Sequence, residues 1–321
     1  MTDIAVPMSV AVVIPCFNHG RFLPDAITSV VRQNYASVEC VVVNDGSQDD
    51  TVPVAARFGV RIINQPNLGV SSARNAGLAA VRTDFVVFLD ADDELLPDAV
   101  AHGLDALASD PTAAAVVGRC EVMDIGGHPL PAFYDEIDAS NLYDEWLSKN
   151  FVWTPGAAMF RRQALEAIGG FPAGVGPAAD YAVFLTLSRT GRVRFTTQHM
   201  VRYRQHETNM SGDPVLMLRA TLAVLEREMR DAPAPARRRI RDGRRMWCEW
   251  YGEQIVHRLR IDWHAGRHGS DQVRAAITLL RHCRRVALRH AWRKTRMTAA
   301  WLWRHARTSA QLAVRSRRVA P

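Results

Sequence analysis

The stretch from Phe85 to Leu96, FVVFLDADDELL, indicates how the first half of the chain folds. Its apolar run, Phe85–Leu89, predicts a short buried strand of the kind found inside parallel sheets. The run ends in four carboxylates, Asp90, Asp92, Asp93 and Glu94. Because ligands of open α/β sheets bind outside the carboxyl ends of the strands, we expect these carboxylates to line a binding site.

Crowded carboxylates repel one another unless a positive group joins them. Mg²⁺ suits this position because it is usually held by one or two carboxylates together with waters and substrate phosphates. A solvated acidic turn before the next helix is the alternative, since carboxylates are also common in the first turn of helices. The acidic pattern alone leaves both interpretations open.

Strand and helix patterns alternate along the chain up to this stretch. Strands are expected at Val10–Ile14, where Pro15 ends the run, and at Val38–Val43, Val60–Asn64 and Phe85–Leu89. Helices are expected at Phe22–Gln33, Thr51–Phe58 and Gly69–Val81. Such alternation predicts βαβ units, and therefore an α/β fold with a mostly parallel sheet. Asp45 and Asp90 then lie at the same edge of that sheet.

The composition, with 48% hydrophobic and 23% charged residues, is typical of a globular protein. No stretch reaches the roughly eighteen apolar residues of a transmembrane helix. The N-terminus shows no basic region followed by a long apolar run, so we expect a cytoplasmic protein. The cysteines never form a CxxC pair, which favours reduced thiols over a disulfide framework or a zinc site.

Charge divides the chain near residues 212–214. Residues 1–214 contain 15 Lys and Arg against 25 Asp and Glu, net −10, whereas residues 215–321 contain 25 against 8, net +17. Six of the eight tryptophans also lie in the second part. We therefore predict a first domain at 1–214 and a basic, Trp- and Arg-rich extension at 215–321.

The basic extension shows helical apolar spacing at Met217–Met229, Ile240–Leu259 and Gln272–Trp303, with a break at Ala232–Pro235. Arginine interleaved with tryptophan suits helices that lie on an anionic membrane surface. The alternatives are helices that only pack on each other or on the first domain, and helices that bind a protein or nucleic acid. No nucleic-acid-binding motif accompanies the charge, so nucleic acid is not an expected partner.

Four motifs in the first domain together resemble glycosyltransferase family 2. They are CFNH at 16–19, VVNDGSQDDT at 42–51, NLGVSSARNAGL at 67–78 and FLDADDEL at 88–95. The resemblance covers about residues 8–212. It implies a GT-A fold, which is a Rossmann-like sheet with flanking helices, followed here by a helical C-terminal extension. The nucleotide half is expected at about 8–100 and the acceptor half at 101–214.

The resemblance implies a site for a nucleotide diphosphate sugar and a divalent cation, Mg²⁺ or Mn²⁺. Asp92 corresponds to the usual metal ligand and Asp90 to the acid near the ribose and the metal-bound waters. Asp45 matches the acid that accepts a hydrogen bond from a uracil ring. Pro15, Phe17 and Asn18 correspond to the nucleoside pocket. Arg74 matches a basic contact near the base and phosphates, with a structural counterion as its alternative role.

A second group of motifs follows at Phe151–Ser211. By resemblance, Trp153, Thr154 and Gly156 lie near the acceptor, and Asp180 is the general base that takes the proton from the acceptor hydroxyl. Its alternative role is the N-cap of the following helix. The family often has Glu before this Asp, whereas this chain has Ala179, which places the support of that Glu in doubt.

The segment VRYRQHETNMS at 201–211 resembles the loop that closes the family's site. By that resemblance, His206 is a second metal ligand and Arg204 contacts the diphosphate. The loop is expected to order over the bound nucleotide and exclude water from the reacting sugar.

The function that the resemblance implies is inverting, metal-dependent transfer of a sugar from a nucleotide diphosphate sugar, UDP-linked, to a hydroxyl acceptor. The acceptor is expected to be a glycan or a lipid-linked molecule, in the synthesis of cell-surface polysaccharide or glycolipid. Membrane contact through 215–321 would make the protein peripheral on the inner face of the membrane. The alternatives are a non-catalytic nucleotide- or carbohydrate-binding protein that keeps the fold, and a nucleic-acid-binding protein that acts through its basic extension.

Overall fold

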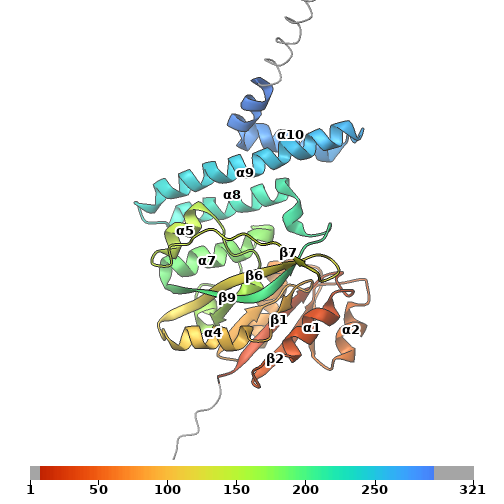
Figure 1. Ribbon diagram of the computed structural model, residues 1–321, viewed down its shortest axis with the longest axis vertical. Helices are drawn as coiled ribbons and strands as arrows, with labels where there is room; N and C mark the ends of the chain where they lie inside the picture. Colours follow the sequence, from red (N-terminus) through yellow and green to blue (C-terminus); the bar gives the residue numbers. More distant parts are fainter. Residues whose placement is uncertain (1–7, 293–321) are drawn as a thin grey trace, which may run out of the picture. The chain divides into compact units, whose positions relative to one another are not determined.

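The computed structural model describes residues 8–292, which form two compact units divided between Arg244 and Arg245 (Figure 1). The first unit contains the sheet and its flanking helices, and the second is helical. The division falls within one long helix, α9 (Ala236–His264). The acidic strand ends singled out in the sequence all lie in the first unit.

Four parallel strands form the first half of the sheet, in the order β3-β2-β1-β4. Their bounds are Val10–Cys16 for β1, Val38–Asn44 for β2, Arg61–Asn64 for β3 and Phe85–Phe88 for β4. The helices between them are α1 (Leu23–Val31), α2 (Thr51–Arg57) and α3 (Val70–Ala80). Figure 1 shows α1 and α2 beside strands β1 and β2. The strand and helix order expected for this half is confirmed.

Strand β1 differs from the expectation because it continues through Pro15 to Cys16. A proline is tolerated in a strand where its missing N–H leaves no ladder bond unmade. Strand β4 pairs with β1 along Val10–Val13, and Leu89 N–H donates the last bond between the two strands, to Val13 O. Pro15 therefore lies just beyond the part of β1 that needs donors for β4.

Helix α3 packs directly on β1 through a glycine. A Cβ atom on Gly77 would lie 2.2 Å from Val13 Cγ1, so no larger residue fits between this helix and the strand. Because α3 begins just after the Asn67–Gly69 loop, this close packing fixes the SSARNAG segment against the sheet. The side chain of Arg74, one turn before Gly77, is thereby directed to the carboxyl ends of the strands.

Antiparallel pairs form the second half of the sheet, so the whole sheet is mixed. Strand β8 (Ala158–Arg161) pairs antiparallel with both β4 and β6 (Ala113–Met123). Strand β9 (Arg192–Arg204) is parallel to β6 and antiparallel to β5 (Glu94–Leu95), and β7 (Pro129–Leu130) pairs with β6. The parallel arrangement expected from the βαβ pattern thus holds for strands β1 to β4, from which it was inferred.

The remaining helices of the first unit cover the second half of the sheet. They are α4 (Ala99–Ala108), α5 (Leu142–Ser148), α6 (Arg162–Ala167), α7 (Ala179–Thr190) and α8 (Pro214–Asp231). Single turns lie at η1 (Pro155–Ala157), η2 (Gly176–Ala178) and η3 (Met210–Gly212). The aromatic core stacks Trp146 on Phe184, with ring centroids 5.4 Å apart, and Phe184 on Phe160, 6.0 Å apart.

Helix α8 belongs to the first unit, although it follows the change of charge at Pro214. Leu218 and Leu225 of α8 are buried. Glu228 forms an ion pair with Arg189 of α7 at 2.8 Å and accepts a 2.7 Å hydrogen bond from the Tyr143 hydroxyl of α5. The first compact unit therefore extends past Pro214, where the charge of the sequence changes. The domain boundary expected at Pro214 stays a prediction.

The second unit contains the rest of α9, helix α10 (Ser270–His282) and a helical segment at 284–292. Cys283 and Val286 pack on Gly252 of α9, where an added Cβ would lie 3.1 and 3.0 Å from them. The helical C-terminal extension is confirmed, with a break at Cys283 inside the segment expected to be one helix. Trp301 and Trp303 lie outside the described residues. None of the helices within 8–292 is long and apolar enough to cross a membrane.

Candidate active site

The carboxyl ends of β1, β2 and β4 meet at one edge of the sheet, as the alternation of strands and helices predicts. Asp45 follows β2, and its N–H donates to Cys16 O at the end of β1 over 2.9 Å. Asp90 follows β4 by two residues. The end of β9, at Arg204, and the start of α7, at Asp180, come to this edge from the second half of the unit.

Arg74 and Asp90 form a tight ion pair at the centre of this edge. The Nη2 atom of Arg74 lies 2.7 Å from Asp90 Oδ1, and the arginine side chain is only 4% exposed. Its Nε atom is buried without a hydrogen-bond partner among the described residues. A buried donor of this kind is costly unless something else satisfies it, so Arg74 retains binding capacity beyond its pairing with Asp90.

Asp180 lies in the first turn of α7, buried near Arg74 and Asp90. The helix N-cap is Ala178, so Asp180 is not the cap residue. Its Oδ1 accepts the Tyr181 N–H over 2.8 Å. Burial raises the pKa of Asp180 to about 6, although the positive charge of Arg74 works in the opposite direction. A carboxyl group with such a pKa is poised to exchange protons near neutral pH. Ala179, beside it, is completely buried.

Asp92 faces two imidazoles. His206 Nε2 lies 2.9 Å from Asp92 Oδ2, and His19 Nδ1 lies 3.9 Å from the same oxygen. Phe22 stacks on the His206 ring with centroids 4.9 Å apart, and Thr208 Oγ1 lies 2.8 Å from His206 Nδ1. The structure therefore brings together the two residues expected to bind metal. Within 8–292, no group of three or more His, Cys, Asp or Glu side chains is arranged to hold a metal ion.

Asp93 has a different role from its acidic neighbours, which the sequence did not reveal. Its side chain is buried, with Oδ2 accepting a 2.7 Å hydrogen bond from Thr154 Oγ1 and Oδ1 a 3.0 Å bond from Arg204 N–H. Burial, followed by the charges of Asp92 and Asp90, raises its pKa well above the usual value for an aspartate. Asp93 therefore joins three segments that are far apart in the sequence.

Arg204 uses its donors within the protein. Its guanidinium is 4% exposed and pairs with Glu94 at 2.6 Å and Asp25 at 3.0 Å. Its Nε donates to Asp92 O and its Nη1 to Ile125 O. Arg204 thus holds the acidic loop in place. The diphosphate contact suggested by resemblance stays a prediction.

The expected nucleoside residues surround the ends of β1 and β2. Asp45 is buried and accepts hydrogen bonds from Gln65 Nε2 at 2.6 Å and from the N–H groups of Leu68 and Gly69, both at 2.9 Å. Asn18 has a positive φ of 55° and accepts the Gln48 N–H over 2.8 Å. Beside it, Phe17 is 44% exposed, and Pro15 lies in β1. Gln65, which orients Asp45, was not anticipated.

The three residues expected near the acceptor differ in exposure. Trp153 is 38% exposed, whereas Thr154 is 1% exposed and its hydroxyl is bound to Asp93. A Cβ on Gly156 would lie 3.0 Å from Val201 Cγ2. Of the three, only Trp153 therefore presents a side chain that a ligand could contact.

Asn75, next to Arg74, ties the two halves of the unit together. Its amide donates to Phe171 O and accepts the Phe171 N–H, both over 2.8 Å. The Phe171 ring packs on Phe88 at 4.7 Å and lies 5.2 Å from the Arg74 guanidinium. Gly170 has a φ of +72°, and its backbone approaches Asn75 so closely that a Cβ would clash. The adjacency of Asn75 to Arg74 was the only sequence signal for this role.

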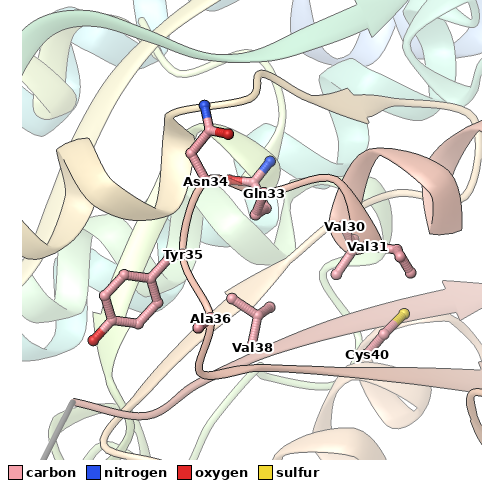
Figure 2. Close-up of a pocket in the computed structure, with 8 residues that line it drawn as sticks. All are labelled: Val30, Val31, Gln33, Asn34, Tyr35, Ala36, Val38 and Cys40. Carbon is pink, nitrogen blue, oxygen red and sulfur yellow. The ribbon is translucent and has the colours of Figure 1, made fainter.

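A separate shallow cavity of about 470 Å³ lies between α1 and β2, lined by residues including Gln33, Tyr35 and Cys40 (Figure 2). It adjoins Val38 at the start of β2, which is the opposite end of the strand from Asp45. Burial raises the pKa of the Cys40 thiol to about 12, so the thiol is unreactive at neutral pH. This cavity is not part of the candidate active site.

The site thus combines three features at the carboxyl ends of β1, β2 and β4. They are the polar residues that follow these strands, the Asp92 carboxylate with its adjacent imidazole, and the buried Asp180 carboxylate with its raised pKa. These features agree with the GT-A fold and site that the sequence resemblance implies. Residues 11–169 match the sequence pattern of "Glycosyl transferase family 2". The chain belongs to this family through the domain that these residues define.

A curated relative agrees with this assignment, and solved structures share the fold. The hyaluronan synthase of Pasteurella multocida is 29% identical over 213 residues, which are 64% of this chain but only 21% of that protein. Staphylococcus aureus TarS 1–349, in complex with UDP-GlcNAc, superposes with a TM-score of 0.61 at 14% identity, covering 85% of this chain and 80% of that one.

A second solved structure is the mannosyltransferase PcManGT from Pyrobaculum calidifontis, in complex with GDP-Man and Mn²⁺. It has a TM-score of 0.58 and 22% identity, and the match covers 93% of this chain and 86% of that one. At such identities these two structures bear on the fold alone. The GT-A fold expected from the sequence is thereby confirmed.

The buried pair of Thr154 and Asp93 generates the first testable prediction. Replacing Thr154 by Val removes the donor to Asp93 and the acceptor for Gly156 N–H while keeping the side-chain volume. Leaving such a buried group unsatisfied costs about 1–3 kcal/mol, so the free energy of unfolding in urea should fall by that amount. Thr154→Ser keeps the hydroxyl and serves as the control. Equal stability of T154V and wild type would show that the bond is unimportant.

Proposed function

We propose that this chain is an inverting glycosyltransferase that moves a sugar from a UDP-linked donor to a hydroxyl of a glycan or lipid-linked acceptor. The observation that carries the proposal is the position of Asp180, buried near the Arg74–Asp90 ion pair at the sheet edge, with a pKa of about 6. A general base needs such a pKa because it must be ionised at working pH and still accept a proton. The shared fold supports the same proposal.

In the proposed reaction, Asp180 accepts the proton of the acceptor hydroxyl. The freed oxygen attacks the anomeric carbon of the donor sugar from the side opposite the diphosphate. The new C–O bond forms as the bond to the diphosphate oxygen breaks, and the bonding electrons leave with the nucleoside diphosphate. The configuration at the anomeric carbon is inverted, through a transition state with oxocarbenium character like that of glycoside cleavage.

The carboxylates at this sheet edge would repel the diphosphate of the donor, so its binding requires a positive charge there. Asp92 and His206 would hold a divalent cation, since their Oδ2 and Nε2 atoms are 2.9 Å apart and an oxygen with an imidazole nitrogen suits Mn²⁺. Two protein ligands are sufficient where substrate phosphates complete the coordination. When bound, such a cation acts as a Lewis acid that stabilises charge on the departing diphosphate. In this proposal Asp45, Asn18 and Phe17 contact the nucleoside, and Arg74 adds positive charge near the phosphates.

Replacing Asp180 by Asn tests the proposed base. Asn keeps the size of the side chain and can still accept the Tyr181 N–H, but it cannot take a proton. We expect sugar transfer to fall by about 10²-fold or more while UDP binding persists. Asp105→Asn, on the exposed surface of α4, is the matched control. Transfer at the wild-type rate in D180N would refute the assignment.

The pH dependence of wild-type transfer follows from the same group. Asp180 is active when ionised, and burial raises its pKa to about 6. The rate should therefore be constant above that pH and fall about ten-fold per unit below it. The residual rate of D180N should not show this decline. A wild-type rate that stays level down to pH 4.5, about a unit and a half below the Asp180 pKa, would exclude Asp180 as the base.

Calorimetry with UDP, in Mn²⁺ and again in chelator, tests the donor site. We expect binding that requires the metal in wild type and is lost in Asp92→Ala, because the variant lacks the carboxylate that would share the cation. Asp105→Ala, which removes a carboxylate from the exposed surface of α4, is the control. Affinity for UDP that is indifferent to metal would remove the metal from the proposal. Absence of binding to UDP, GDP and dTDP alike would favour the non-catalytic alternative.

We also propose that the second unit binds an anionic membrane surface, which would bring the enzyme to a lipid-linked acceptor. On α10, Val273, Ile277 and Leu280 follow one another at helical spacing and are 60%, 58% and 61% exposed. The other face of α10 buries Ala275 and Leu279. At helical spacing, Arg274 and Arg281 lie along one side of the exposed stripe. An apolar stripe bordered by arginines has the pattern of a helix that lies at a lipid interface.

Flotation of the full chain with lipid vesicles tests this membrane proposal. Wild type should float with vesicles containing phosphatidylserine and not with pure phosphatidylcholine. Changing Ile277 and Leu280 together to Ser should lower the bound fraction roughly ten-fold or more, because each buried side chain contributes about 1.5–3 kcal/mol. Leu216→Ser on α8, where Leu216 is 40% exposed, is the control. Equal flotation of the double variant, or salt-dependent binding to RNA instead, would contradict the proposal.

A further inference from the structure

A cluster of aromatic and basic side chains surrounds Trp153 in the first unit. The rings of Tyr134 and Trp153 stack with centroids 5.5 Å apart and an angle of 21° between their planes. The guanidinium carbon of Arg119 lies 5.0 Å from the centre of the Tyr134 ring, and His199 meets that ring edge-on at 5.8 Å. Arg119 and His199 are paired residues of β6 and β9. The cluster is therefore assembled from four separate segments.

The cluster is joined to the candidate active site by a single residue. Thr154, which follows Trp153, is 1% exposed and donates its hydroxyl to Asp93 over 2.7 Å. Asp93 is adjacent in sequence to Asp92, which faces His206. The backbone at Trp153 is consequently held close to the acidic edge, and its indole is 38% exposed.

Polar groups border the aromatic surface. The Nε atom of Arg119 is buried and has no hydrogen-bond partner among the described residues. Burial raises the pKa of the Tyr134 hydroxyl to about 12, so this group stays protonated and able to donate at neutral pH. An exposed aromatic face with a few convergent donors is the usual composition of a site for a small ligand.

We propose that Trp153, Tyr134 and Arg119 form an acceptor subsite that binds the pyranose ring of a sugar. A pyranose presents an apolar face of C–H groups, which packs on the electron-rich face of an indole, and a rim of hydroxyls, which Arg119 and Tyr134 can bind. This inference rests on the proposed function, because the ring bound here would carry the hydroxyl that Asp180 deprotonates. It assigns to the acceptor two residues, Tyr134 and Arg119, that no sequence motif indicated.

Saturation-transfer NMR of the full chain tests the subsite, with methyl β-D-glucopyranoside and methyl N-acetyl-β-D-glucosaminide as probes. At about 10 mM, probes with affinities in the millimolar range are detected. Wild type should transfer saturation to the ring protons of at least one glycoside. It should transfer none to sorbitol, an acyclic polyol with similar hydroxyls but no ring face. Trp153→Ala and Tyr134→Ala should each reduce the signal at least five-fold.

Two variants control for disturbance of the loop. Tyr134→Phe keeps the stacked ring and removes only the hydroxyl, so its signal should fall less than that of Tyr134→Ala. Phe133→Ala changes a neighbour that is 85% exposed, and it should behave as wild type. Circular dichroism of each variant identifies any that fails to fold. If an alanine variant does not fold, Tyr134→Phe still tests the subsite, because complete loss of its saturation-transfer signal would contradict binding to the stacked rings.

The outcomes separate this inference from the proposed function on which it rests. Undiminished glycoside signals in both alanine variants, or no signal from either glycoside in a wild-type protein that binds UDP, would overturn the subsite alone. Failure of wild type to bind any nucleotide would instead refute the proposed function. Loss of glycoside signal in the alanine variants, with metal-dependent UDP binding retained, is the result that supports the subsite.

Discussion

Mutual repulsion of carboxylates at one edge of the sheet is the constraint on which this structure depends. The fold neutralises most of them individually. Arg74 pairs with Asp90 at 2.7 Å, Arg204 with Glu94 at 2.6 Å, and Thr154 donates a hydrogen bond to Asp93. Asp92 is left facing imidazoles and Asp180 is left buried with a raised pKa. The carboxylates to which we assign chemistry are those that have no arginine of their own.

This division of roles explains why two buried arginines are placed as they are. Arg74 lies on helix α3, which packs closely against β1 at Gly77. Arg204 is the last residue of the 13-residue strand β9. Each reaches the same acidic loop from a different half of the unit. Because a buried charge without a partner is strongly destabilising, folding of the second half is coupled to the presence of the acidic loop in the first. The geometry of the candidate site and the stability of the unit therefore depend on the same ion pairs.

The first half of the fold could be predicted from sequence because its strands are continuous β-branched runs and its connections are short. The second half could not, since β6, β8 and β9 pair across long separations that leave no periodic signal. The same limit applies to the site. Asp45, Asp90 and Asp92 follow strands and carry recognisable motifs, whereas the bond from Arg204 N–H to Asp93 joins residues that are 111 positions apart. Gln65 acts through a side-chain bond to Asp45, and Asn75 through bonds to the Phe171 backbone. No pattern of residue types records either contact.

The double hydrogen bond between Asn75 and Phe171 bears on how a product would leave under the proposed function. A hinge motion that separated the two halves of the unit would break both bonds and expose the Phe171 ring, which packs on Phe88. The segment 205–213 after β9 is more exposed and rests on a few polar contacts, such as the bond from His206 N–H to Asn209. Under the proposed function, a nucleotide would leave by displacement of this segment, which keeps the two halves of the unit joined. Under the proposed function, the Asn75–Phe171 bonds would hold the proposed base, Asp180, at a constant distance from the donor site from one turnover to the next.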